Sequence, residues 1–311
     1  ARWKGNMIVE GARHGMKLAQ LKGGILDPAL GMTYYDAARV FYQIADFTQD
    51  ARFKGYAEDA VYVYGQRYVI PNSGGVPGYW RFSGGLRENA MRSVGFSESR
   101  RALMMLKATA FTSMAQADFD AWHAKFGSER EIAFALLAHQ DAEALGSPVH
   151  PRHRQLVDRL FAYVAQKCDP AQWGTLQVSP FMSALVAEAL IAEWEKTGDP
   201  RTVPALRVLA DNTWMESWHS ATRSMLYQVN RANVSEGGRS QTGAPDLNLL
   251  IAPWYAWLWT QTQDATYRDQ ADELFIGGVQ GAWIATDGPP KTFMQNYRWS
   301  FDYMKWRGLT S

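Results

Sequence analysis

The chain has 311 residues, of which 47% are hydrophobic and 20% are charged, a composition typical of globular proteins rather than disordered ones. Its formal net charge of +1 gives no general attraction to nucleic acid or to a membrane surface, and its apolar runs are too short to span a bilayer. The single cysteine, Cys168, excludes an intramolecular disulfide. We therefore expect neither nucleic acid nor a membrane among the partners.

Apolar residues recur at helical spacing along most of the chain, and capping residues stand at many of the expected helix starts. In chain order, these patterns predict helices over approximately residues 7–21, 33–46, 53–69, 97–112, 115–126, 128–145, 152–167, 180–197, 202–214, 247–259, 265–283 and 293–307. A short helix over 86–92 and a short helix or strand over 224–229 are also expected. The sequence therefore predicts an all-α protein.

A helical hairpin recurs in this pattern. An apolar helix stops at a Thr-x-Asp turn, and a second helix returns, at Thr48-Gln49-Asp50, at Thr197-Gly198-Asp199 and at Thr262-Gln263-Asp264. In the second of these turns, Asp199 is placed to cap the returning helix. Pairing the first helix with the last gives six hairpins, with the compact turns on one face and the long loops on the other.

This arrangement resembles the (α/α)6 toroid of carbohydrate-active enzymes of the polysaccharide lyase and glycoside hydrolase type. Phe181-Met182, Thr197-Gly198-Asp199 and the segment QNYRWSFDY at 295–303 look like toroid segments. The resemblance covers nearly the whole chain and implies a single catalytic domain over 1–311. It also implies a polysaccharide substrate, and so a secreted bacterial protein, extracellular or periplasmic, either alone or as part of a larger multidomain protein.

The resemblance implies a cleft at the face where the inner helices start, walled by loops 71–96 and 219–245. Exposed aromatic rings in such a cleft would stack on sugars, and arginines would pair with sugar carboxylates. The residues expected to bind substrate there are Tyr34, Tyr35, Trp80, Arg81, Arg87, Arg223, Arg239, Gln295, Tyr297 and Arg298. One ring of the Tyr34–Tyr35 pair is expected to face the core and the other the cleft.

Two reactions fit these residue types. The first is β-elimination on a uronic-acid polymer, in which Tyr227 or His219 would transfer protons while Asn230 and Arg231 neutralise the sugar carboxylate. An excess of arginine over acidic residues on the proposed face favours this lyase slightly.

The second reaction is inverting hydrolysis, in which two carboxylates stand about 6.5–9.5 Å apart. Glu88 would protonate the leaving oxygen and Asp246 would activate water, although Asp246 is equally suited to capping a helix. A non-catalytic carbohydrate-binding domain is the third interpretation.

The histidines do not form a recognisable metal motif. His139 lies within a predicted helix and reads as a packed residue, while His150 and His153 flank a proline turn without an evident carboxylate partner. The sequence has no HExxH, paired-cysteine, P-loop or GxSxG signature. We therefore expect no metal and no obligatory cofactor.

Overall fold

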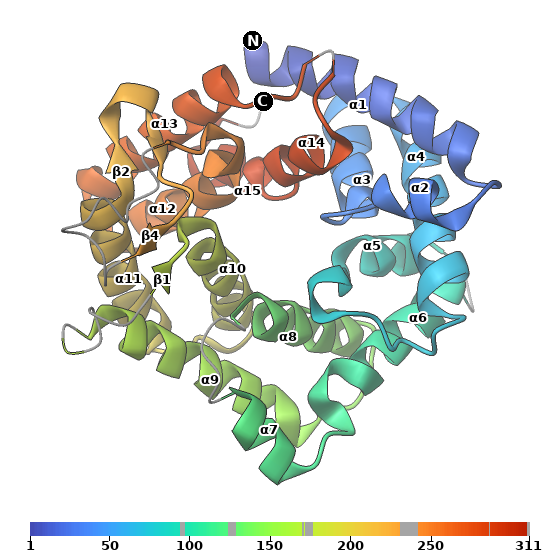
Figure 1. Cartoon of the computed structure of the whole chain (residues 1–311), viewed down its shortest axis with the longest axis horizontal. Coiled ribbons are helices and arrows are strands. Elements are labelled where there is room, and N and C mark those ends of the chain that lie inside the picture. Colours follow the sequence, from blue (N-terminus) through green and yellow to red (C-terminus); the bar gives the residue numbers. More distant parts are fainter. Residues whose placement is uncertain are drawn as a thin grey trace. The chain divides into compact units, whose positions relative to one another are not determined.

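The structure is a computed structural model that describes residues 1–93, 97–123, 129–169, 171, 177–230, 242–285 and 287–309 (Figure 1). It is mostly helical, which confirms the all-α prediction. The described α-helices are α1 (Arg2–Leu21), α2 (Leu26–Gly31), α3 (Ala37–Thr48), α4 (Ala51–Val61), α5 (Gly84–Arg92), α6 (Glu98–Lys107), α7 (Gln116–His123), α8 (Glu129–Ala144), α9 (Pro151–Cys168), α10 (Pro180–Thr197), α11 (Thr202–Ser217), α12 (Asn248–Thr262), α13 (Ala265–Gly281), α14 (Pro290–Tyr297) and α15 (Ser300–Trp306).

Short irregular elements connect these helices. Two π-helical turns, Tyr62–Val69 and Ala108–Thr112, extend α4 and α6. The described 3-10 turns are Gly78–Trp80, Ser220–Thr222 and Pro245–Leu247. Two antiparallel strand pairs are described: β1 (Gln177–Val178) with β4 (Val229–Asn230), and β2 (Trp218–His219) with β3 (Ser224–Met225).

The chain forms two compact units. Unit 1 comprises Ala1–Leu156 with Ile284–Met294, and unit 2 comprises Val157–Trp283 with Gln295–Ser311. In unit 1, α3 packs against α4 and α5. In unit 2, α12 contacts α10, α13 and α15, and its residues from Asn248 to Leu258 are all buried, which explains why its sequence is apolar on every side. The single-domain toroid stays a prediction.

The three Thr-x-Asp turns have the same hydrogen bonds. In each turn the middle residue has a left-handed backbone, with φ of 58°, 68° and 57° at Gln49, Gly198 and Gln263. The threonine hydroxyl donates to the carbonyl four residues earlier, at 2.7–2.8 Å. The aspartate accepts the amide two residues later, at 2.9–3.1 Å. The three turns that repeat in the sequence therefore also share one backbone conformation and one set of hydrogen bonds.

The left-handed residue gives the first testable prediction. Gly198→Ala should lower the free energy of unfolding by about 1 kcal/mol, because a left-handed backbone is unfavourable for residues with a Cβ. A Cβ at Gly198 would meet no atom within 4 Å, so crowding contributes nothing. Gly55→Ala is the matched control, since Gly55 is equally open but lies within α4, where alanine should instead stabilise. Urea unfolding curves that shift in the same direction for both variants would contradict this reading.

Some expected helices differ from the observed ones. The helix expected from residue 33 begins at Ala37, because Tyr35 and Asp36 are left-handed and the Asp36 carboxylate accepts the Gly85 amide at 3.1 Å. The helix expected over 293–307 is divided into α14 and α15, and the break lies at Arg298. The segment expected to be a helix or strand over 224–229 contains β3 and the start of β4.

Candidate functional site

A cluster of aromatic rings in unit 1 surrounds the 3-10 turn Gly78–Trp80. The Trp80 ring lies 4.6 Å from that of Tyr34 and 5.9 Å from that of Tyr68. Tyr34 and Trp80 are half-buried, whereas Tyr35 is buried behind them. The buried Tyr64 hydroxyl donates to the Trp80 carbonyl at 2.5 Å and accepts the Phe82 amide at 2.9 Å, which fixes the backbone of this turn.

Charged side chains lie at the edge of this cluster. The Arg130 guanidinium lies 5.3 Å from the Tyr79 ring and pairs with Glu131 at 2.7 Å. Lys291 lies 5.9 Å from the Tyr34 ring. Tyr79 is 41% exposed. The cluster therefore combines an accessible ring with the Lys291 ammonium and with the ion pair between Arg130 and Glu131.

The Tyr34 hydroxyl keeps its proton at neutral pH and is therefore a hydrogen-bond donor. Burial, followed by the neighbouring Tyr35, raises the pKa of Tyr34 to about 12, and Arg130 opposes this shift only partly. Within the described residues, no side chain or backbone group hydrogen-bonds to this hydroxyl. A bound ligand could therefore accept its proton in a hydrogen bond.

A cavity of about 630 Å³ adjoins the cluster through Gly78 and Arg81. The lining residues come from in and just after the 3-10 turn, from in and just after the π-helical turn that extends α6, from α7 and from α8. They are Gly78, Arg81, Thr109, Phe111, Ser113, Met114, Asp118 and Glu131. Gly78 packs directly against Glu131, because a Cβ there would come within 2.5 Å of the Glu131 Cγ. A side chain at this position would push the turn away from α8.

The backbone of the cavity wall is strained. Phe111, which lines the cavity, has φ 62° and ψ 1°, and Ala110 before it has φ −82° and ψ 66°. The left-handed conformation costs a residue such as phenylalanine roughly 1–2 kcal/mol. The Ala110 carbonyl faces His139 Nε2 at 3.2 Å, and the Phe111 carbonyl accepts from Arg152 Nε at 3.1 Å. These two contacts from α8 and α9 hold the strained pair in place.

Arg81 lines the cavity but already has protein partners. It is buried, and its guanidinium donates to the Leu106 carbonyl at 2.6 Å and to the Thr109 hydroxyl at 2.9 Å. Burial lowers its pKa, and the nearby Tyr64 opposes that shift. Arg81 therefore joins the turn to α6, and its expected role in substrate binding stays a prediction.

The arginine and glutamate expected on α5 are ion-paired. Arg87 contacts Asp141 at 2.8 Å and Glu88 at 3.1 Å, and Glu88 also contacts Arg92 at 3.4 Å. The negative charge of Asp141 is the chief cause of the raised Arg87 pKa, because the Asp141 carboxylate stabilises the charged guanidinium. Neither Arg87 nor Glu88 is among the residues that line the cavity.

The candidates in unit 2 are dispersed around the strands. Tyr227 is 51% exposed, and its ring lies 5.4 Å from that of Phe181. His219 Nδ1 is 2.8 Å from the Thr222 hydroxyl. Arg223 forms a two-pronged ion pair with Glu273, with both contacts at 2.9 Å. The exposed Tyr227 is therefore the most accessible of these three groups.

Asp246 has a structural role. Its carboxylate accepts the Trp283 amide at 2.5 Å, and its carbonyl accepts from the Asn296 side chain at 3.0 Å. Asp246 lies in the 3-10 turn that precedes α12, so it ties this turn to the end of α13 and to α14 rather than capping α12 itself.

The three candidates near residue 297 are buried in unit 2. Gln295, Tyr297 and Arg298 are only 4%, 1% and 3% exposed. Arg298 forms an ion pair with the equally buried Glu188 of α10. All three therefore lie in the core of unit 2, and their expected role in substrate binding stays a prediction.

Three remaining candidates can be placed only in part. Asn230 pairs through its backbone with Gln177 in the β1–β4 ladder. Arg231 and Arg239 lie outside the described residues. The neutralising role expected of Asn230 and Arg231 stays a prediction.

Sequence reasoning missed several residues of the unit 1 site. Arg130, Thr109, Phe111, Asp118 and Glu131 were not expected there. A glycine at position 78, between Pro77 and two aromatic residues, was the available signal that another element packs closely against this turn.

No protein-family model, curated protein or solved structure matches the chain. None of the described helices has both the length and the apolar character that crossing a membrane requires.

Proposed function

We propose that the protein acts on a polysaccharide and that unit 1 binds sugar residues along Tyr34, Tyr79 and Trp80. The observation that carries this proposal is the half-buried aromatic cluster beside a cavity of about 630 Å³. Aromatic faces bury the apolar side of a sugar ring, while polar groups nearby receive its hydroxyls. The cluster is held by Tyr64, so it needs little rearrangement on binding.

The favoured reaction is β-elimination on a uronic-acid polymer. This reaction removes the proton at C5, breaks the bond from C4 to the leaving oxygen and forms a C4–C5 double bond. It needs positive charge at the sugar carboxylate, a base for the proton and an acid for the leaving oxygen. Arg130 and Lys291 bring positive charge to the aromatic cluster, and the protonated Tyr34 hydroxyl is a suitable hydrogen-bond donor. Proton transfer by Tyr227 or His219 belongs to the same proposal.

The described contacts of Glu88 and Asp246 do not favour the hydrolase alternative. Glu88 is engaged by Arg87 and Arg92, and Asp246 accepts the Trp283 amide. A non-catalytic carbohydrate-binding protein would share the aromatic cluster, so it is the alternative outcome of the activity measurement. We also propose that the helical pairs close into an (α/α)6 toroid and that the protein is secreted.

The test combines binding with turnover. Trp80→Ala should weaken binding of a uronate oligosaccharide roughly 10- to 100-fold, because loss of a stacked aromatic surface removes about 1.5–3 kcal/mol. Trp283→Ala is the matched control, since Trp283 is 59% exposed but lies in unit 2 and outside the aromatic cluster. Calorimetry gives the affinity, and absorbance of the unsaturated product reports elimination on alginate, glucuronan, pectate and hyaluronan.

Equal affinity for both variants would contradict the assignment of the sugar-binding surface. If the protein binds at least one of these polymers but turns over none of them, the result would favour a carbohydrate-binding protein. Release of reducing ends without the double-bond absorbance would favour hydrolysis.

A further inference from the structure

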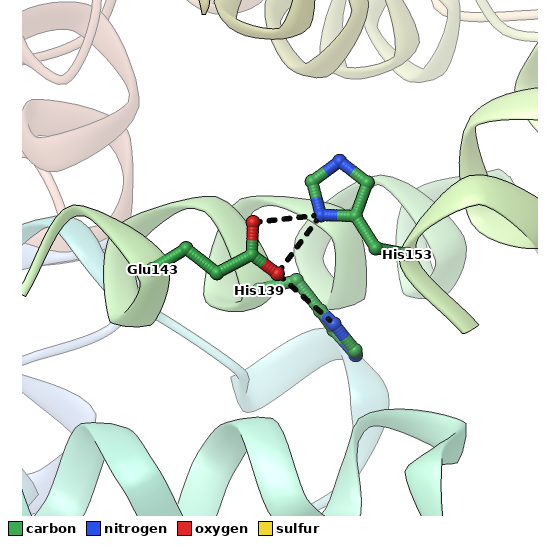
Figure 2. Close-up of side chains that lie close together, drawn as sticks. All are labelled: His139, Glu143 and His153. Atoms are coloured by element: carbon green, nitrogen blue, oxygen red, sulfur yellow. Dashed lines mark hydrogen bonds and ion pairs between the residues drawn. The ribbon is translucent and has the colours of Figure 1, made fainter. Parts of the chain in front are cut away.

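Two histidines and a glutamate meet between α8 and α9 in unit 1 (Figure 2). One potential ligand atom from each of His139, Glu143 and His153 lies within 4.8 Å of the other two. His153 Nδ1 is 3.1 Å from one carboxylate oxygen of Glu143 and 3.2 Å from the other. His139 Nδ1 is 4.0 Å from Glu143 Oε1. Glu143 is the carboxylate partner that the sequence did not reveal for these histidines.

The hydrogen bonds of His139 leave a lone pair directed at the cluster. Its Nε2 lies 3.2 Å from the Ala110 carbonyl, which can only accept, so Nε2 carries the proton. In the neutral ring Nδ1 is then unprotonated, and it is buried without a hydrogen-bond partner among the described residues. Burial, chiefly, lowers the His139 pKa to about 4, so the ring is neutral at physiological pH.

This is the arrangement that a metal-binding histidine requires. Histidine ligands usually donate their second ring nitrogen to a carbonyl or carboxylate, which fixes the tautomer and orients the lone pair. We propose that His139 Nδ1, His153 Nδ1 and a Glu143 carboxylate oxygen bind a divalent transition-metal ion, with Zn²⁺ as the preferred ion.

The spacing suits zinc. Bonds of about 2.0–2.2 Å to nitrogen and oxygen place neighbouring ligand atoms of a tetrahedral ion roughly 3.4 Å apart. The contact between His153 and Glu143 is already close to that separation, whereas His139 Nδ1 is 4.0 Å from Glu143 and must move closer, since the three ligand atoms lie within 4.8 Å of one another. Two histidines and one glutamate leave the fourth position for water or another ligand.

Lys107 is the group that competes with a metal ion here. Its ammonium lies 3.2 Å from Glu143 Oε1 and also donates to the Ser147 hydroxyl and the Pro148 carbonyl. Since it keeps these two acceptors, Lys107 can release Glu143 without losing all its hydrogen bonds. Its positive charge disfavours a second cation nearby, so it lowers the affinity of the site for a metal ion.

A bound ion would also influence the cavity. His139 holds the Ala110 carbonyl, and Ala110 precedes the strained Phe111 in the cavity wall. The ion would fix the His139 ring and therefore stabilise this strained segment. The metal site does not depend on the proposed action on sugars.

The experiment uses the whole chain after treatment with a chelator. Titration with Zn²⁺ in a calorimeter should show one ion per chain, and Co²⁺ should give the visible absorption of a four-coordinate nitrogen and oxygen site. His153→Asn and Glu143→Gln should each weaken zinc binding by more than about 100-fold, a larger effect than the loss of a group outside the coordination shell. Asparagine at 153 retains an amide that can donate to Glu143.

His150→Asn is the matched control. The His150 ring is 6.4 Å from that of His139, and its Nδ1 accepts the Arg152 amide at 3.1 Å, so zinc affinity should be unchanged. The Co²⁺ spectrum of the unaltered chain needs no variant, so it tests the site even if Glu143→Gln fails to fold. No visible Co²⁺ band, or equal zinc affinity in the unaltered chain and folded His153→Asn, would overturn the proposal. A loss in His150→Asn as large as that in His153→Asn would do so as well.

Discussion

Glu188→Ala should lower the free energy of unfolding by about 3–5 kcal/mol, because it would leave the Arg298 guanidinium buried without its counter-ion. Glu188 and Arg298 are 4% and 3% exposed, and they join α10 to the break between α14 and α15. Water cannot solvate the charge left behind unless the packing opens. The measurement is urea unfolding followed by both tryptophan fluorescence and far-ultraviolet circular dichroism, since the chain has two compact units.

The exposed ion pair between Arg223 and Glu273 is the matched control. Its side chains are 38% and 43% exposed, so Glu273→Ala should cost only about 0–1 kcal/mol. The double variant Glu188→Leu with Arg298→Met should lose much less than the sum of its two single variants, because no buried charge remains. Similar small losses of unfolding free energy in Glu188→Ala and Glu273→Ala would contradict a structural role for the ion pair between Glu188 and Arg298. That result would favour Arg298 as a residue that binds substrate.

Tyr227→Phe should reduce turnover on a uronate polymer by about 10²–10⁴ if Tyr227 is the proton-transfer group, the range typical for loss of a general acid or base. The hydroxyl is the only group changed, and the ring contact with Phe181 is retained. His219→Ala is made separately, because either residue can serve in the proposal. The reaction is followed by the absorbance of the unsaturated product at several substrate concentrations, which separates kcat from KM.

Tyr62→Phe is the control for this experiment, since Tyr62 is 40% exposed but lies in the π-helical turn after α4. Near-normal turnover in both Tyr227→Phe and His219→Ala would exclude the assignment. Loss of activity in Glu88→Gln and Asp246→Asn on a neutral glycan, with inversion of the product anomer, would establish the hydrolase instead.

The parts of the fold that depend on nearby residues could be predicted from the sequence. The hydrogen bonds of the Thr-x-Asp turn at Thr197 all lie between Glu193 and Arg201, so the threonine, the glycine or glutamine, and the aspartate are enough to predict it. The helix break at Arg298 was not predictable in this way. Its partner Glu188 lies 110 positions earlier in the chain, and the apolar spacing on both sides of the break favours one continuous helix.

The same distinction applies to the sites. Tyr34 and Trp80 were expected to converge, and the structure brings their rings within 4.6 Å. Arg81 was expected to face substrate, but its burial depends on acceptors at Leu106 and Thr109. The histidine cluster was missed because Glu143 and His153 lie on two different helices, so the spacing of the residues along one helix did not reveal it. Long-range packing decides which polar groups are exposed, and a single sequence does not show it.

The self-contained turns bear on how such a chain could lengthen during evolution. Each Thr-x-Asp turn ends one helix and starts the next through hydrogen bonds within its own segment. These hydrogen bonds do not depend on the neighbouring helical hairpin. A tandem duplication of a two-helix segment would therefore copy the residues that end the first helix and start the second. The duplicated hairpin must then acquire an apolar face that packs against its new neighbours. Single substitutions on the helices can produce this face while the turn stays unchanged. The glutamine, glycine and glutamine at the three middle positions are the kind of divergence this route permits, because a side chain at a left-handed turn residue costs only about 1–2 kcal/mol.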